Sequence, residues 1–416
     1  MVLAACDAEF PDNPPAQASP APRVTSPSHL PKGADAAASS PSPVTTVASA
    51  ASPRPAVTQP AEAPPASRAS PSPFPESLRR LCANGVAVPD PQDNPGLVED
   101  CAILLSVRDQ LAGTAPLNWS ADRAIASWWG VQIVVFTSPR ADVRVRGIYL
   151  KSTQLTGSLP PALGALSDLE VLDVAGNQLT GRIPPELGAL SKLQGLLLWD
   201  NQLTGEIPRE LSALTELRQL FLARNQLAGP IPPELGDLAN LEDLLLGDNQ
   251  LTGGIPTELG ALARLTFLYL GGNRLSGSIP PELGTLADLT VLDLGDNQLV
   301  GGIPAEVGTL TRLQILDLRN NQLDGKIPPW LGNLTRLEEL DLAYNQFTGG
   351  IPPELAQLTE LQALDLEGNQ LTGNVPAGLA DLPNLQTLSL RGNQLSGAAT
   401  MRKNARFYLE HVQRAT

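Results

Sequence analysis

The chain is 416 residues long and carries a formal net charge of −15 at pH 7, with a sequence pI near 4.6. An acidic balance of this size argues against nucleic acids and anionic membranes as partners, because both attract basic proteins. No stretch approaches the ~18 consecutive apolar residues of a membrane-spanning helix.

Residues 1–10 contain the tetrapeptide Leu-Ala-Ala-Cys at 3–6, followed by Asp7. This motif resembles the lipobox of bacterial lipoproteins, in which the cysteine is acylated after signal cleavage. The resemblance implies a lipid anchor on Cys6, with plain secretion and a cytosolic location as alternatives. Two residues precede the motif, so the charged and apolar parts of a signal peptide are not in front of it.

Residues 11–75 have the composition of a disordered segment. They contain 17 prolines among alanine, serine and threonine, and no aromatic residue lies between Phe10 and Phe74. Such a segment cannot bury an apolar core, so we expect a disordered tether with polyproline character. A long tether behind a lipid-bearing cysteine suits a protein displayed at a surface.

Residues 76–144 predict a second, non-repeating unit. It begins with an amphipathic helix that Gly113 ends. The apolar face of this helix consists of Leu97, Cys101, Leu104, Leu105 and Leu111. Asn-Trp-Ser at 118–120 and Trp-Trp-Gly-Val at 128–131 follow, and strand-like residues then lead into the next segment.

Residues 145–397 repeat one 24-residue pattern ten times and begin it an eleventh time. The copy at 169–192 opens with Leu-x-x-Leu-x-Val-x-x-Asn-x-Leu-x-Gly-x-Ile-Pro-x-x-Leu-Gly. The alternation at its start predicts a strand with one buried face, and the later glycine and proline oppose a long helix. A fixed period in this range indicates a solenoid whose copies are stable only when stacked. We expect the amide of Asn177 and its equivalents to satisfy buried backbone in the turn.

These residues resemble the plant-type leucine-rich repeat over about three-fifths of the chain. The resemblance implies an α/β solenoid, a curved horseshoe with a parallel β-sheet on its concave face. It also implies a binding role, since members of the family serve as receptor ectodomains and as inhibitors of secreted enzymes. The unit at 76–144 resembles the N-terminal cap of such proteins, which shields the open apolar end of the first copy.

The cap departs from the family pattern in its cysteines. The family usually brackets its Trp-x-Gly-Val with two cysteines, whereas Ala126 and Ile133 occupy those places here. If Cys6 carries a lipid, Cys82 and Cys101 remain as an even pair, which suits an oxidising compartment. We therefore expect a Cys82–Cys101 disulfide elsewhere in the cap.

Residues 398–416 lose the repeat pattern. They predict either a short capping helix, with Phe407, Leu409 and Val412 on its apolar side, or a frayed tail. Catalysis is not expected in any part of the chain. The only histidines are His29 and His411, so the folded body has no imidazole for a triad or proton shuttle. No phosphate-binding glycine loop, cofactor site or metal site is predicted.

The position between the two inward residues of each strand is left free by the repeat. It is apolar in four successive copies, and neighbouring outward positions add two aromatic residues. We predict a solvent-facing partner-binding strip of six residues: Leu197, Trp199, Phe221, Leu245, Phe267 and Tyr269. Exposed aromatic strips often mark interaction sites. The alternative is that these side chains only favour strand surfaces and pack on one another.

The same position carries aspartate in four later copies. The members of this acidic ladder are Asp293, Asp317, Asp341 and Asp365. Like charges at strand spacing repel, so the ladder invites a cation or a basic partner. The alternative is that aspartate is simply common at this position, with Arg319 offsetting part of the charge.

The sequence therefore predicts a non-catalytic recognition protein outside the cytoplasm, lipid-anchored at a bacterial cell surface. We expect a protein or peptide to bind the concave face, and polysaccharide stays open as a ligand that would use the same aromatic residues. Two alternatives are a passive structural or adhesive surface protein and an inhibitor of a secreted hydrolase.

Overall fold

The computed structural model describes residues 75–134, 143–396 and 406–408. The chain divides into two units, Met1–Ala69 and Ser70–Thr416, and every described residue belongs to the second. The predicted lipidation site Cys6 and the predicted tether as far as residue 74 lie outside the described residues.

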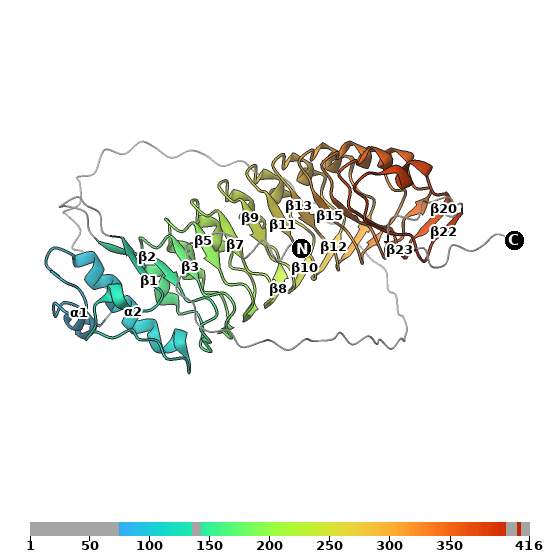
Figure 1. The fold of residues 1–416 in the computed structure, drawn as a ribbon. Helices are drawn as coiled ribbons and strands as arrows, with labels where there is room; N and C mark the ends of the chain where they lie inside the picture. The colour runs from blue at the N-terminus through green and yellow to red at the C-terminus, as the bar shows by residue number, and fades with distance from the viewer. Residues whose placement is uncertain (1–74, 135–142, 397–405, 409–416) are drawn as a thin grey trace, which may run out of the picture. The chain divides into compact units, whose positions relative to one another are not determined.

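The second unit is a stack of coils, each of which adds one short strand to a common sheet (Figure 1). Among the described residues this main sheet has thirteen strands, and from β2 to β23 each strand pairs in parallel with the next. Leu172 pairs with Leu196, and Leu196 pairs with Leu220, so the register advances by one copy per strand. The predicted parallel sheet is confirmed. Its strands are β1 (Val131–Val134), β2 (Arg144–Tyr149), β3 (Val171–Asp173), β5 (Gly195–Leu197), β7 (Gln219–Phe221), β9 (Asp243–Leu245), β11 (Phe267–Tyr269), β13 (Val291–Asp293), β15 (Ile315–Asp317), β17 (Glu339–Asp341), β19 (Ala363–Asp365), β21 (Thr387–Ser389) and β23 (Arg406–Tyr408).

The inward positions of these strands build a continuous core. Leu172, Leu196 and Leu220 are fully buried, and the corresponding leucines of the later strands are buried with them. Each buried leucine contributes about 1.5–3 kcal/mol by leaving water. That gain exists only when the next coil covers the side chain, which is why stacking stabilises the array.

The repeated asparagine joins neighbouring coils. Asn201 donates its side-chain amide to the carbonyls of Leu198 (3.1 Å) and Val174 (3.0 Å), and its Oδ1 accepts from the backbone N–H of Leu179 (2.9 Å). Asn225 and the later equivalents make the same set of contacts. One side chain thus satisfies buried backbone groups of two coils, and the predicted structural role is confirmed.

A second set of short strands follows the asparagine of each copy. They form a seven-stranded sheet from β4 to β16 and a three-stranded sheet from β18 to β22. Each strand ends near a glycine such as Gly181, whose φ of +81° is a backbone conformation that L side chains rarely adopt. The strands are β4 (Thr180–Gly181), β6 (Gln202–Gly205), β8 (Gln226–Pro230), β10 (Gln250–Gly253), β12 (Arg274–Gly277), β14 (Gln298–Gly301), β16 (Gln322–Leu323), β18 (Thr348–Gly349), β20 (Gln370–Asn374) and β22 (Gln394–Ser396).

Short 3₁₀ helices return the chain to the main sheet. Pro184, with φ −68°, sets the entry to one of them. A Cβ on Gly188 would lie 2.2 Å from the carbonyl oxygen of Glu210 in the next coil, so only glycine permits this close stacking. The helices are η3 (Pro161–Ala165), η4 (Pro185–Ala189), η5 (Arg209–Ala213), η6 (Pro233–Asp237), η7 (Thr257–Ala261), η8 (Pro281–Thr285), η9 (Ala305–Thr309), η10 (Pro329–Asn333), η11 (Pro353–Gln357) and η12 (Ala377–Asp381).

A cap of two α-helices precedes the coils. It contains α1 (Glu76–Cys82), α2 (Pro95–Ala112), the 3₁₀ helix η2 (Ile125–Ser127) and β1, which pairs antiparallel with β2. Helix α2 ends at Gly113 as predicted. Its burial is wider than one face, however: Leu105 is partly buried while Ile103, on the opposite side, is fully buried. The reason is that α2 contacts α1, β2 and η3 at once.

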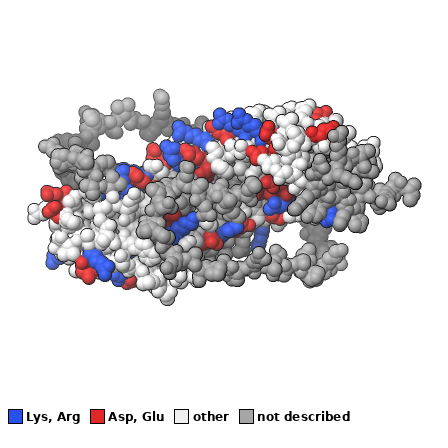
Figure 2. Space-filling model, in the orientation of Figure 1, with Lys and Arg blue, Asp and Glu red and all other residues white. Residues whose placement is uncertain are grey.

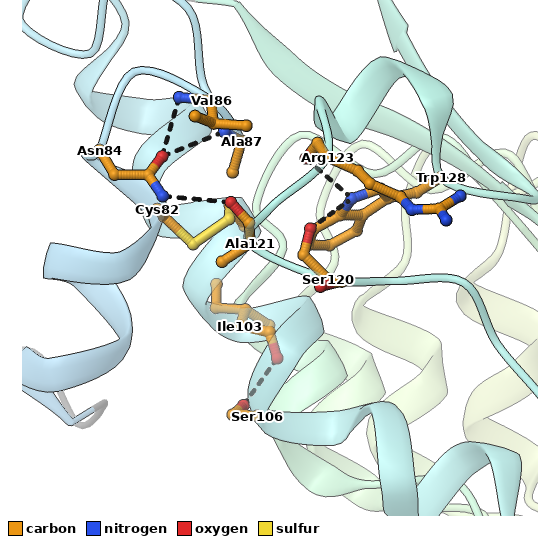
Figure 3. The surroundings of a disulfide bond; sticks show 11 residues. Cys82, Asn84, Val86, Ala87, Ile103, Ser106, Ser120, Ala121, Arg123 and Trp128 are labelled. Carbon is orange, nitrogen blue, oxygen red and sulfur yellow. Dashed lines mark hydrogen bonds between the residues drawn. A yellow bond between two sulfur atoms is a disulfide. The ribbon is translucent and has the colours of Figure 1, made fainter.

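The predicted Cys82–Cys101 disulfide is present and joins α1 to α2 (Figure 3). Beside it, the Asn84 side chain accepts from the backbone N–H groups of Val86 (2.8 Å) and Ala87 (3.2 Å) and donates to the carbonyl of Ala121 (3.1 Å). These contacts hold the loop after α1 against the tryptophan-containing segment. The indoles of that segment, Trp119 and Trp128, stack with their centroids 6.0 Å apart.

A buried ionic network fastens the cap to the first coil. Asp100 of α2 is 1% exposed and accepts from the guanidinium of Arg144 (2.7 and 3.0 Å) and the backbone N–H of Val145 (2.8 Å). Arg144 also donates to Asp168 in the next coil (2.8 Å). A buried carboxylate is tolerated here because its acceptors are filled.

At the other end of the sheet, Arg406–Tyr408 form β23, which pairs in parallel with β21. This strand stands where the sequence suggested a helix or a tail. Leu409 and Val412, which were expected to share the apolar side of that helix, lie outside the described residues.

Candidate functional site

The predicted binding residues lie on the outward face of the main sheet, on strands β5 to β11 and just after β5. Leu197 pairs with Phe221, Phe221 with Leu245, and Leu245 with Tyr269. Neighbouring strands are about 4.8 Å apart, so these four residues form one continuous row, which we call the apolar strip. The structure thus brings together four residues that are separated by a full copy in sequence.

The predicted solvent exposure of the strip is wrong for three of its members. Leu197 is 6% exposed, Phe221 is 8% exposed and Leu245 is 6% exposed. The cause is cross-strand packing, because each of these side chains has a large apolar neighbour on the adjoining strand. The strip is therefore closely packed, and these three side chains are not protruding anchors.

The remaining three predicted residues flank or end the strip and are partly buried. Trp199 lies after β5, and the ammonium of Lys151 sits 5.0 Å from its ring centroid in a cation–π contact. Phe267 opens β11 and is in register with Asp243 and Val291 on the adjoining strands. Both aromatic residues thus widen the apolar strip on its two sides.

Tyr269 is held in place at the end of the strip. Its hydroxyl donates to Asp248 (2.8 Å), and a Cβ on Gly247 would lie 2.2 Å from its ring. Glycine at 247 therefore leaves the room that the ring occupies. Burial, together with the hydrogen bond to Asp248, raises the pKa of Tyr269, so the phenol stays a neutral donor at physiological pH.

The acidic ladder continues the same row on strands β13 to β19. Asp293 pairs with Asp317, Asp317 with Asp341, and Asp341 with Asp365. Burial is the largest cause that raises the pKa of Asp293 to about 6 and those of Asp317 and Asp341 to about 7. Burial also raises the pKa of Asp365. Part of the ladder is therefore protonated near neutral pH.

Arg319 is the cation of this region. Its guanidinium lies 2.8 Å from Asp317, 3.3 Å from Asp296 and 3.7 Å from Asp341. It neutralises part of the ladder, as the sequence suggested. No group of three or more His, Cys, Asp or Glu side chains in the described part of the chain is arranged to hold a metal ion.

The aspartates also have a backbone role that sequence analysis missed. Asp317 Oδ1 accepts from the N–H of Arg319 (3.0 Å), and Asp341 Oδ1 accepts from that of Ala343 (2.9 Å). Aspartates often bond to a backbone group two residues on, so the position of aspartate after the middle of each strand was a usable signal. This local capping explains why aspartate recurs there without any ligand.

A hollow of about 740 Å³ lies along the glycine–proline segments of neighbouring coils. The sequence analysis did not predict this hollow. Its signal was the residue between glycine and isoleucine, which varies from copy to copy and, as Arg182 and Glu206, lines the hollow. Its charged lining consists of Arg182, Glu206, Arg209, Glu210 and Glu234. Figure 2 shows acidic and basic side chains lying side by side on the drawn face.

No helix among the described residues is both long and apolar enough to cross a lipid bilayer. The family described as "Leucine-rich repeat region" matches residues 248–414, and the family "Leucine Rich Repeat" matches residues 168–190, 192–214 and 216–238. No curated protein matches the chain.

Several solved structures resemble the chain. The leucine-rich-repeat ectodomain of the Arabidopsis thaliana membrane receptor kinase GASSHO1/SCHENGEN3, in complex with CASPARIAN STRIP INTEGRITY FACTOR 2, matches with a TM-score of 0.68 and 43% identity over 71% of this chain and 36% of that one. The Arabidopsis receptor kinase HAESA, in complex with the peptide hormone IDA and the co-receptor SERK1, matches with a TM-score of 0.65 and 35% identity over 71% of this chain and 50% of that one. The chain thus spans half or less of these two structures.

A plant ice-binding protein matches along nearly its whole length. Its TM-score is 0.61 and its identity is 32%, over 72% of this chain and 95% of that one.

Proposed function

The chain belongs to the leucine-rich-repeat family, and on that premise we propose that it is a non-catalytic recognition protein that binds a protein or peptide partner on the concave face of its array. The carrying observation is the apolar strip, a row of large apolar side chains on four consecutive strands. Neighbours of known structure were solved with peptide hormones bound, which supports a peptide as the partner.

The surface of the strip suits this role. A closely packed row binds a partner by excluding water across a flat area, without the penalty of ordering flexible anchors. Trp199 and Tyr269 add aromatic edges and polar tips, which are enriched in binding hot spots. The acidic ladder marks the end of the apolar surface, because ionised aspartates would resist desolvation by an apolar ligand.

The test is a two-site substitution in the full chain. Peptides selected from a random library on the wild-type protein are titrated against a Phe221→Ala, Tyr269→Ala variant, which we expect to bind at least tenfold more weakly. The matched control is Asp341→Ala with Asp365→Ala, two outward positions of the same sheet that should leave affinity within twofold. Equal affinity for wild type and the first variant would place the site elsewhere.

We also propose that the protein acts outside the cytoplasm and is anchored through Cys6 at a bacterial cell surface. The lipobox-like motif, the proline-rich composition of residues 11–75 and the disulfide in the cap support this location. Palmitate labelling in a bacterial host, with the chain expressed behind a bacterial signal peptide, tests it: the wild type should incorporate label and a Cys6→Ser variant should not. Absence of label from the wild type would refute the anchor.

A second candidate function is adhesion to a regular surface, and the likeness to a plant ice-binding protein favours it. The supporting observation is a threonine that recurs at one position of the second set of strands, although other residues, such as Ala228 and Val300, replace it in some copies. The hydroxyls of Thr180, Thr204 and Thr348 each donate to a carbonyl of the preceding coil (3.3, 3.2 and 3.0 Å), which fixes their orientation. Thermal hysteresis of the purified protein tests the idea, and ice growth indistinguishable from that with albumin would rule it out.

A further inference from the structure

The outward residue of each strand, in the apolar strip or the acidic ladder, determines whether a nearby backbone N–H group has a hydrogen-bond acceptor. In the aspartate copies, the backbone N–H two residues after the aspartate is bound by its carboxylate. Asp293 accepts from Gly295 (3.0 Å), and Asp341 accepts from Ala343 (2.9 Å). In these copies a side chain on the outward face therefore reaches this N–H.

The four apolar copies have no such acceptor. Within the part of the chain that the structure describes, no hydrogen-bond acceptor serves the N–H groups of Trp199, Ala223, Gly247 and Gly271. Ala223 is 2% exposed, and Gly247 and Gly271 are buried. Buried N–H groups without a partner are rare in proteins, and three in successive coils, next to the N–H of the partly buried Trp199, call for an explanation.

The stacking of the coils leaves these donors unused. The N–H groups on either side of Trp199 pair with the next coil: Leu198 donates to Phe221 (2.8 Å) and Asp200 donates to Ala223 (3.0 Å). In the preceding coil, the carbonyl of Val174 already accepts from the amide of Asn201 (3.0 Å). The asparagine bonds thus replace the strand ladder at this point, and the outward face is the remaining route to the N–H.

These four N–H groups form what we call the donor row, and we propose that two alternate members, those of Trp199 and Gly247, bind main-chain carbonyls of a peptide in the polyproline II conformation, lying along the apolar strip. This deepens the proposed function and rests on it. The spacing supports the assignment. Two strands separated by one other strand are about 9.6 Å apart. One turn of a polyproline II helix is three residues, or about 9.3 Å. Carbonyls three residues apart then meet the N–H groups of Trp199 and Gly247.

The chemistry of the two surfaces also agrees. A polyproline II helix makes no internal hydrogen bonds, so its carbonyls are free to accept. Aromatic-lined surfaces are a recurring way of binding such helices, because prolines pack flat on rings. Trp199, Phe221 and Tyr269 supply rings beside the donor row. A peptide with apolar residues at every third position would place them all against the strip.

The test compares two substitutions at the same positions. Leu197→Ala with Leu245→Ala removes apolar contact and leaves the donors open. Leu197→Asn with Leu245→Asn removes the same contact and places an amide oxygen where the aspartate oxygen caps the N–H in later copies. The probe is a fluorescein-labelled nonapeptide of three Leu-Pro-Pro triplets, titrated by fluorescence anisotropy against the full chain.

We expect the asparagine variant to bind this peptide roughly tenfold more weakly than the alanine variant, because two donors are occupied. Equal weakening of both variants would overturn the donor row and leave the strip as the binding site. No weakening of either variant would overturn the proposed function as well. Circular dichroism of both variants serves as the folding control.

A second measurement addresses the conformation of the peptide. The wild type should bind the Leu-Pro-Pro peptide at least tenfold more tightly than a flexible nonapeptide of three Leu-Ser-Gly triplets, since the first is already ordered. Equal affinities, or no binding of the Leu-Pro-Pro peptide, would overturn the polyproline II assignment. In amide spectra, the signals of Trp199 and Gly247 should shift most on binding.

Discussion

Strands β5 to β11 and strands β13 to β19 share one frame and present two different surfaces. Leu196 and Leu316 are both fully buried on the inward side. Asn201 and Asn321 bond to their neighbours in the same way. On the outward side, however, the first group carries the apolar strip and the second carries the acidic ladder.

The difference shows that one outward position per coil decides two properties of the face. An aspartate there, such as Asp317, brings charge and occupies the backbone N–H two residues on. A leucine there, such as Leu245, brings apolar area and leaves the N–H of Gly247 open. The frame is neutral to this choice, so binding chemistry can vary while the fold is kept.

The largest expected effect concerns what the two groups share. Asn225→Ala, beneath the apolar strip, and Asn321→Ala, beneath the acidic ladder, should each lower the free energy of unfolding by about 3 kcal/mol or more. Each change leaves several buried backbone groups without a partner. Urea denaturation followed by circular dichroism measures both.

The two losses should agree within about 1 kcal/mol, because the two asparagines make the same set of hydrogen bonds. Gln226→Ala, at the exposed position next to Asn225, is the control and should leave stability nearly unchanged. A large difference between the two asparagine variants would mean that the outward row alters the frame itself.

Most of the frame could be predicted from sequence, because the repeat fixes it locally. The spacing of Leu196 and Leu198 identifies the inward side, and Asn201 identifies the turn, without knowledge of any distant contact. The parallel sheet followed from the same pattern and from the family resemblance, whereas the Cys82–Cys101 disulfide followed from the two cysteines that remain if Cys6 carries a lipid. Periodicity carries this information because each coil contacts only its neighbours.

The outward face was harder to predict, because its properties depend on contacts between copies. The alternation of inward and outward residues predicted that Phe221 is exposed. Its neighbours on the adjoining strands cover it, however, and its side chain is 8% exposed. The open N–H of Ala223 cannot be recognised without knowing that the asparagine bonds displace the strand ladder. The strand at Arg406–Tyr408 depends on pairing with β21, and no local sequence pattern predicts this pairing.

The second prediction concerns the pH dependence of stability, which the aspartates of strands β13 to β19 should cause and the apolar residues of strands β5 to β11 should not. Burial raises the folded-state pKa of Asp293 to about 6 and those of Asp317 and Asp341 to about 7, above the unfolded value near 3.9. Between about pH 4 and pH 7 the folded protein therefore binds more protons at these sites than the unfolded chain. Stability should therefore fall as pH rises through this window.

The control for this effect is a variant in which Asp293, Asp317, Asp341 and Asp365 are all replaced by asparagine. Asparagine keeps the oxygen that accepts the backbone bond and cannot ionise, so the fall between pH 5 and pH 7.5 should shrink. Thermal unfolding at the two pH values measures it. An unchanged pH dependence would assign the effect to other buried acids, such as Asp100, whose pKa burial also raises.

The smallest expected effect comes from single substitutions that add or remove the acceptor for this backbone N–H. Asp341→Ala should destabilise the array by about 1 kcal/mol relative to Asp341→Asn, because only the alanine leaves the N–H of Ala343 without an acceptor. In the other direction, Leu245→Asn should be more stable than Leu245→Ala by a similar amount, since its amide oxygen can cap Gly247. Urea midpoints at pH 7.5 measure all four variants. If asparagine and alanine are equivalent at both positions, the carboxylate bonds of the acidic ladder contribute nothing to folding, and the aspartates are there for their charge alone.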